Sequence, residues 1–268
     1  MNRPSCLLAS ALTAGMLLST AACSTGGVSG ASGRSDVPAS PMAKDSPTAS
    51  TPPMLTAAQA QAALITNADL ESQWIGTEGT ATWHDGLLKS KVDAEAFVTD
   101  KQNAADCQKL LDGLYAEDLL GDPKGAQALT GFDDSDYDGQ MHYQVAGYGQ
   151  AEVDAKLAWV KTLPGKCDRF TAVDNKGGQQ TVQVVSSSLP DVGDAREGLR
   201  ITMSGELDGD SSTLTLDFAA VRVGDSALSL TNGGLDGADK DSTRQAVQAG
   251  AARLKDALAG MTPPPAQG

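Results

Sequence analysis

Between residues 169 and 230 the sequence alternates apolar and polar side chains, and no other feature constrains the fold as strongly. Alternation with a period of two is typical of strands that have one buried face. It is clearest at 182–184, 199–204, 214–218, 221–223 and 227–230. Gly224-Asp225 is typical of a two-residue hairpin turn. Because parallel neighbours need long crossover connections, strands this close in the sequence predict antiparallel pairing.

Apolar residues at helical spacing surround this strand region. They predict helices at 55–64, 104–120, 151–163 and 242–261. The third helix is expected to end at Pro164-Gly165, and Ser242-x-x-Gln245 predicts a capping box at the start of the fourth. The predicted fold class is α+β, with a mainly antiparallel sheet, helices packed on one face and one disulfide.

The first 23 residues have the pattern of an export signal. Arg3 precedes an apolar stretch from Cys6 to Ala22, which is short for a bilayer span. Ala21-Ala22-Cys23 resembles a lipobox, the recognition site of the bacterial lipoprotein pathway, although Thr20 stands where leucine is usual. That resemblance implies a signal peptide at 1–22 and a lipid on Cys23, which would hold the chain at the outer face of the cytoplasmic membrane. The alternative is an ordinary secretory peptide with an incidental cysteine.

Residues 23–54 are mostly Ser, Thr, Gly, Pro, Ala and Asp. A segment of this composition cannot bury enough apolar surface to offset its ordering entropy, so a disordered linker is expected. A flexible chain of this length has an average reach of roughly 30 Å. The predicted organisation is therefore a linker at 23–54, one globular domain at 55–261 and a flexible tail at 262–268.

Two cysteines belong to the predicted domain. Cys6 leaves with the signal peptide and Cys23 carries the lipid, so Cys107 and Cys167 remain. Export would place them in an oxidising compartment, which predicts a disulfide between them. The alternative, a reactive or metal-binding thiol pair, lacks CxxC spacing and a nearby histidine.

The chain is acidic, with 34 Asp and Glu residues against 20 Lys and Arg. A negative field of this kind repels phosphate backbones, so nucleic acid is not an expected partner. The negative charge is compatible with basic ligands and with metal ions. It is also compatible with a role of the charge in solubility alone.

The clearest local metal signal is Asp134-Ser-Asp136-Tyr-Asp138-Gly139. In calcium loops, aspartates at alternate positions before a glycine direct their carboxylates to one cation. An EF-hand would need Glu at the twelfth position, where Val145 stands instead. A short calcium loop formed by Asp134, Asp136 and Asp138 is one interpretation, and a solvated acidic turn is the other. Apart from this calcium, no cofactor is expected.

The sequence contains no motif of catalysis or phosphate binding that we can identify. The two histidines are interpreted as structural or surface residues: His84 lies in irregular sequence, and His142 should face solvent from a strand in which Met141 and Tyr143 point inward. Trp159 is expected to pack in the core. Trp74 and Trp83, flanked by Gly and Thr, are candidates to line a cleft.

Three stretches carry a family resemblance: Leu55–Leu64, Tyr143–Gly149 and Ala219–Leu230. The second leads into the helix that contains Trp159, and the third precedes the last helix. In this order they resemble the extracellular sensor domain of the mycobacterial Ser/Thr kinase PknH, a fold also found in actinobacterial lipoproteins. The resemblance implies an antiparallel sheet flanked by helices, with an exposed ligand cleft but no known binding residues. Those kinase domains have two disulfides, whereas this chain can form one.

Three functions are compatible with these features. The first is a non-enzymatic, membrane-tethered module that senses or binds a small ligand or an envelope component. The second is an envelope hydrolase with a carboxylate pair, which would need two carboxylates about 5–10 Å apart in a cleft. The third is a lipid carrier, which would need a cavity lined by aliphatic side chains. A polar groove with neither feature favours the binding module, which is the expected function.

Overall fold

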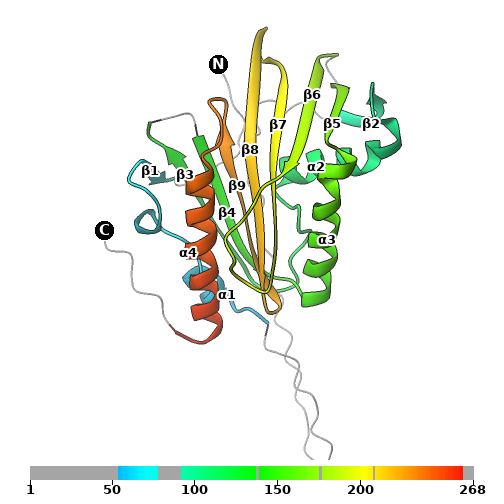
Figure 1. The fold of residues 1–268 in the computed structure, drawn as a ribbon. Coiled ribbons are helices and arrows are strands. Elements are labelled where there is room, and N and C mark those ends of the chain that lie inside the picture. Colours follow the sequence, from blue (N-terminus) through cyan, green and yellow to red (C-terminus); the bar gives the residue numbers. More distant parts are fainter. Residues whose placement is uncertain (1–53, 78–91, 137–138, 175–176, 208, 262–268) are drawn as a thin grey trace, which may run out of the picture. The chain divides into compact units, whose positions relative to one another are not determined.

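The computed structural model describes residues 54–77, 92–136, 139–174, 177–207 and 209–261. They form a nine-stranded sheet in the order β1-β3-β4-β9-β8-β7-β6-β5-β2, and each neighbouring pair is antiparallel (Figure 1). The strands are β1 (Trp74–Gly76), β2 (Val92–Phe97), β3 (Gln127–Asp134), β4 (Gly139–Gly147), β5 (Arg169–Asp174), β6 (Gln179–Ser186), β7 (Ala195–Leu207), β8 (Asp210–Val223) and β9 (Ser226–Gly234). The predicted antiparallel sheet is confirmed.

All described residues belong to one compact unit, Ser50–Gly268. The predicted signal peptide at 1–22, Cys23 and the tail at 262–268 lie outside the described residues, so the predicted domain limits stay a prediction. No described helix is both long enough and apolar enough to cross a membrane.

The described residues contain four α-helices, which are divided between the two faces of the sheet. They are α1 (Ala57–Ala62), α2 (Ala104–Ala116), α3 (Gln150–Lys166) and α4 (Lys240–Leu258). Helices α1 and α4 lie along β3, β4, β8 and β9, whereas α2 lies beside β2 and α3 beside β6 and β7 (Figure 1). The expectation that helices pack on one face only is therefore wrong.

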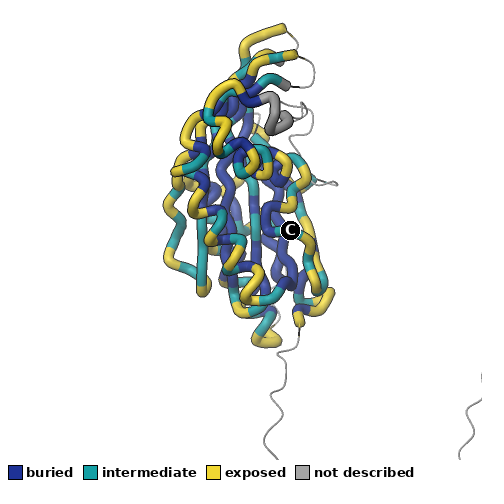
Figure 2. The backbone as a smooth tube through the Cα atoms, turned by 90° about the vertical axis from the view of Figure 1, so that its right-hand side faces the viewer, coloured by how far each residue is buried: buried dark blue, intermediate teal, exposed yellow. Residues whose placement is uncertain are grey.

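The side chains of β8 show why the sheet needs helices on both faces. Leu216 and Phe218 belong to the apolar cluster formed with α2 and α3, whereas Ala219 and Val221 belong to the cluster formed with α1 and α4. A strand that is apolar on both faces must be covered on both, as in sheets buried between two helical layers. Figure 2 shows buried positions running along the strands, with exposed positions at the loops.

His142 is buried, with only 5% of its surface exposed, so the expectation that it faces solvent is wrong. Its Nε2 lies 3.2 Å from Oε2 of Glu117. Glu117 follows α2 directly and adopts a left-handed backbone conformation, which ends that helix before the predicted residue 120. The side of β4 that alternation assigned to solvent is therefore covered by the chain that leaves α2.

Helix α3 continues to Lys166, past the predicted stop at Pro164. Proline removes one backbone donor, but close to the end of a helix the turn can close around it. The backbone N–H of Cys167 donates to the carbonyl oxygen of Leu163 at 2.7 Å, which completes that last turn.

The predicted disulfide between Cys107 and Cys167 is confirmed. It joins the first turn of α2 to the end of α3, and both residues are fully buried. Beside it, Asp106 accepts hydrogen bonds from Lys166 Nζ at 2.6 Å and from Trp159 Nε1 at 2.9 Å. These two bonds, with the Lys166 charge, hold the pKa of the Asp106 carboxyl below its ordinary value. Trp159 packs partly buried against the core of this face, as expected.

Candidate functional site

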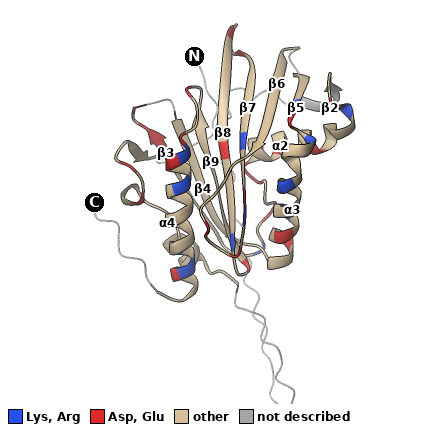
Figure 3. Ribbon diagram, viewed as in Figure 1, with Lys and Arg blue, Asp and Glu red and all other residues tan. Residues whose placement is uncertain are grey.

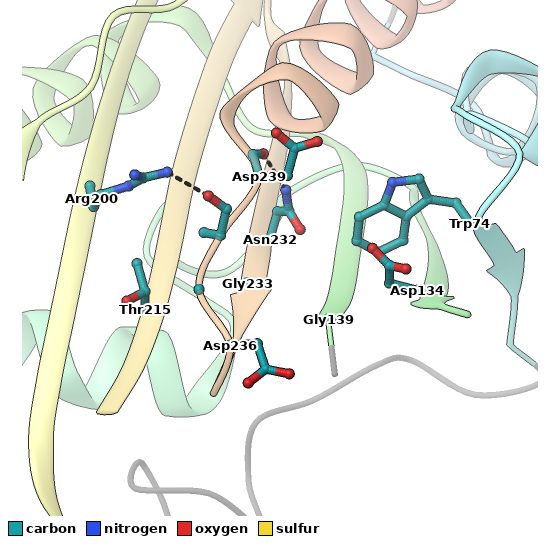
Figure 4. Close-up of a pocket in the computed structure, with 11 residues that line it drawn as sticks. Trp74, Asp134, Gly139, Arg200, Thr215, Asn232, Gly233, Asp236 and Asp239 are labelled. Atoms are coloured by element: carbon teal, nitrogen blue, oxygen red, sulfur yellow. Dashed lines mark hydrogen bonds between the residues drawn. The ribbon is translucent and has the colours of Figure 1, made fainter. Parts of the chain in front are cut away.

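A pocket of about 390 Å³ opens where α4 begins, between the β1–β3–β4 edge and strands β7, β8 and β9 (Figure 4). Its volume falls within the range of roughly 300–1,000 Å³ that is typical of small-ligand sites. The lining residues are Trp74, Asp134, Gly139, Arg200, Thr215, Asn232, Gly233, Asp236, Gly237, Ala238 and Asp239. Six of these eleven have polar or charged side chains besides the tryptophan, so the pocket is a polar one.

Asp239 caps α4 and positions one wall of the pocket. Its carboxylate accepts the backbone N–H of Asp241 at 3.0 Å and that of Ser242 at 3.2 Å. It also accepts the Ser242 hydroxyl at 2.6 Å. The predicted capping box at Ser242 is therefore wrong, because Asp239 provides the cap one turn earlier and Ser242 is buried inside the helix.

Trp74 forms the opposite wall. The residue is only 2% exposed, and its Nε1 donates to the Ser242 hydroxyl at 3.0 Å. This bond connects β1 through Ser242 to the capping carboxylate of Asp239. A Cβ on Gly139 would lie 3.2 Å from Cβ of Asp134, so the glycine keeps this end of β4 close to β3. The expectation that Trp74 lines a cleft is confirmed, whereas Trp83 and His84 lie outside the described residues.

A buried ion pair supports the floor of the pocket. Arg200 in β7 donates from Nε and Nη2 to the two carboxylate oxygens of Asp217 in β8, at 2.6 and 2.7 Å. The Asp217 side chain is 1% exposed and the Arg200 side chain 22%. The hydrogen bond to Asp217 raises the pKa of the Arg200 guanidinium, so it stays charged. Arg200 Nη2 also donates to the carbonyl oxygen of Ala238 at 2.8 Å, which ties the β9–α4 connection to β7.

Asn232 also fixes the connection between β9 and α4. Its Nδ2 donates to the carbonyl oxygen of Asp239 and to Oγ1 of Thr243, both at 2.9 Å. The Thr243 hydroxyl in turn donates to the carbonyl oxygen of Asp239 at 3.1 Å. The start of α4 is thus fixed from both β7 and β9 by hydrogen bonds within the protein.

The pocket carries a negative charge. Among the described residues that line it, Asp134, Asp236 and Asp239 are carboxylates, and the one cation, Arg200, is neutralised by Asp217. Figure 3 shows acidic positions on β3 next to the first turn of α4. Such a site favours a ligand that carries a positive charge or many hydrogen-bond donors.

Burial alone would raise the pKa of Asp239, but hydrogen bonds from Ser242 and from two backbone N–H groups, with the nearby Arg200 charge, hold it below its ordinary value. A carboxyl group with a lowered pKa stabilises the fold above its unfolded pKa, and the stabilisation is lost as the pH falls through the folded value. Asp239→Ala is therefore expected to lower the free energy of unfolding by about 1 kcal/mol at neutral pH. This cost should shrink in acid.

Urea unfolding of both chains at about pH 7 and about pH 3 would measure that difference. Asp239→Asn serves as the control, because asparagine also caps helices but cannot ionise. An Asp239→Ala cost that is equal at both pH values would contradict the assignment of Asp239 as an ionised cap.

The predicted calcium loop is only partly described. Asp134 Oδ1 accepts the backbone N–H of Asp136 at 2.8 Å, and Asp138 lies outside the described residues. Within the described part of the chain, no three His, Cys, Asp or Glu side chains gather closely enough to hold a metal ion. The calcium loop therefore stays a prediction, and so does lipidation at Cys23.

No protein-family model matches this chain. No curated protein matches it by sequence. Among solved structures it is similar to the extracellular domain of PknH from Mycobacterium tuberculosis, with 14% sequence identity and a TM-score of 0.44. That match covers 78% of this chain and 100% of the other.

Proposed function

We propose that this chain is an extracytoplasmic lipoprotein whose domain binds a small polar ligand in the pocket at the start of α4, without catalysing a reaction. Its lipid would be on Cys23, at the outer face of the cytoplasmic membrane. The observation that carries the proposal is a polar cavity of about 390 Å³ with three carboxylates and a neutralised arginine in its wall.

Two features support the location outside the cytoplasm. The sequence before Cys23 has the charge and apolar pattern of an export signal. The disulfide between Cys107 and Cys167 is of a kind that persists in oxidising compartments and is rare in the cytosol.

The lining of the pocket argues against a lipid carrier. Of the described lining residues, Trp74 and Ala238 have apolar side chains, and the acyl chain of a lipid would require many more. The lining also argues against a hydrolase that uses Asp239 as its acid. A general acid needs a raised pKa, whereas that of Asp239 is lowered by the bonds that cap α4.

The direct test is to extract the full-length chain from its own membranes and measure its mass under native and denaturing conditions. We expect a denatured mass that corresponds to cleavage before Cys23 with added acyl chains. Under native conditions we expect an additional small molecule that dissociates on unfolding. An unprocessed chain in the soluble fraction would contradict the proposed location.

Asp236→Arg places a large cation at the mouth of the pocket and should abolish the bound species. Asp236 is exposed, and no hydrogen bond or ion pair is shown for it among the described residues. Asp122→Arg, also at an exposed aspartate but near the other face of the sheet, is the matched control and should retain it. A species retained by Asp236→Arg would show that the ligand binds elsewhere.

A further inference from the structure

On the side of the sheet that carries α4, strands β5, β6, β7 and the first half of β8 are not covered by α1 or α4. Their side chains on this side form three cross-strand rows, which we call the polar sheet face. The first row is Thr171, Thr181, Ser204 and Thr213; the second is Arg169, Gln183, Thr202 and Thr215; the third is Val185 and Arg200, followed by the buried Asp217 and Asn232.

The opposite side of the same strands is core. Val182, Ile201 and Leu214 are buried there against α2 and α3. On the polar sheet face, in contrast, Gln183 and Ser204 are exposed. The sequence therefore places polar groups at alternate positions of these strands, with Val185 as the exception within the rows, and about 4.8 Å separates neighbouring groups within a row.

The hydroxyls of the first row pair with one another. Thr171 and Thr181 hydroxyl oxygens are 3.2 Å apart, and those of Ser204 and Thr213 are 3.1 Å apart. A hydroxyl has one donor and two acceptor sites, so each pair uses only one donor and one acceptor. The remaining donor and acceptors of each pair stay available to a ligand that lies on the face.

The polar sheet face is continuous with the pocket. Arg200 and Thr215 belong to its rows and also line the cavity beside α4. Figure 4 shows both residues on the strands that lead away from the pocket. A ligand longer than the cavity would therefore continue from the three carboxylates onto the rows of hydroxyl and amide groups.

The chemistry of the face selects the class of ligand. Protein interfaces are enriched in aromatic residues and methionine and depleted in serine, whereas Val185 is the one apolar side chain in the exposed part of these rows. An anionic polymer would be repelled by the carboxylates of the pocket and by the charge of the chain. Hydroxyl rows beside a negative pocket complement a chain of sugars that carries a protonated amine.

We infer that the pocket and the polar sheet face together bind an oligosaccharide that contains an unacetylated amino sugar. The ammonium group lies in the pocket beside the exposed Asp236 carboxylate, and the sugar hydroxyls lie along the first and second rows. This inference rests on the proposed function and names the ligand class for the same site.

Two tetrasaccharides that differ only in N-acetylation, and therefore in whether the nitrogen is charged, test the inference: the glucosamine tetramer and the N-acetylglucosamine tetramer. Calorimetric titration uses the full-length chain, in a detergent without a sugar head group, at a pH that keeps the amines protonated. Because a hydrogen bond to a charged group is worth more than a neutral one, we expect the glucosamine tetramer to bind about tenfold or more tightly. Equal affinities, or no binding of either sugar, would overturn the inference.

Variants assign the two parts of the site. Asp236→Asn should weaken the glucosamine tetramer by about tenfold and leave the acetylated sugar unaffected, whereas the control Asp122→Asn should change neither. Gln183→Ala should weaken both sugars, and its control is Gln248→Ala on the exposed side of α4. Near-ultraviolet circular dichroism should show that all four variants fold. Loss of binding in a control variant, or full binding by Asp236→Asn, would contradict the assigned contacts.

The outcomes separate this inference from the proposed function. If a native ligand copurifies and is lost in Asp236→Arg, but the glucosamine tetramer does not bind, the sugar assignment fails and the binding function stands. If the tetramer binds and is then cleaved, the sugar assignment stands and the non-enzymatic function fails. Mass spectrometry of the sugar after incubation distinguishes these cases.

Discussion

Replacing Cys107 and Cys167 together by alanine is expected to lower the free energy of unfolding by about 4 kcal/mol. The disulfide closes a loop with a sequence separation of 60 residues, and a cross-link of this span removes much of the conformational freedom of the unfolded chain. Both residues must be changed, because a single substitution leaves a buried free thiol. Chemical denaturation of the two proteins measures the difference.

A reductant provides the control for this prediction. It should shift the unfolding midpoint of the wild-type chain towards that of the double variant and leave the double variant unchanged. Contacts between α2 and α3 through Asp106, Lys166 and Trp159 remain after the disulfide is removed, so the native fold should persist at room temperature. A loss of less than 1 kcal/mol would mean that the loop is already restricted in the unfolded chain.

Arg200→Ala is expected to cost about 3–5 kcal/mol, because it leaves the Asp217 carboxylate buried without its ionic partner. The Asp217 side chain is 1% exposed, and the Thr243 hydroxyl, whose one proton is shared with the closer carbonyl oxygen of Asp239, lies 3.4 Å from its Oδ2. The reverse change, Asp217→Ala, should cost less, because the Arg200 side chain is 22% exposed and reaches water. The free energies of unfolding of the two variants, from urea denaturation, test this order.

A double variant shows whether the charge is the cause. Arg200→Met with Asp217→Leu removes both charges and retains apolar bulk, so it should recover most of the stability lost in Arg200→Ala. Equal costs for the two alanine variants would contradict the assignment of Asp217 as the more deeply buried partner. A double variant as unstable as Arg200→Ala would show that the hydrogen bond to Ala238, rather than the buried charge, is what matters.

Alternation predicted the strands well where the sheet is buried on one side. Leu199, Ile201 and Met203 face the α3 layer, and Thr202 between them is on the polar sheet face. The rule failed where both sides are covered. His142 alternates with apolar neighbours, yet the residues that follow α2 bury it. A period of two shows that neighbouring side chains differ in their surroundings, but it does not show that one of them is solvent.

The candidate site was predicted only in part. The sequence predicts that Trp74 lines a cleft, because it is a scarce aromatic residue with Gly76 and Thr77 close by. Arg200 and Asp217 were not identified, since they are 17 residues apart and only the register of β7 against β8 brings them together. The sequence feature that could have identified them is a charged residue that stands between apolar neighbours in each of the two strands. Asp239 was missed because Ser242, three residues later, also matches a capping pattern.

The pocket joins segments from opposite ends of the chain. Trp74 donates to Ser242 across 168 residues, and Gln59 in α1 donates to the carbonyl oxygen of Ala257 in α4 across 198 residues. During synthesis the first partner of each contact emerges long before the second, so the contacts that fix the walls of the pocket cannot form until the last helix has been made. Recognition is therefore a property of the finished polypeptide alone: a chain that stops before Lys240 contains all nine strands, but it lacks α4 and with it the Ser242 and Thr243 hydroxyls that fix the walls of the site.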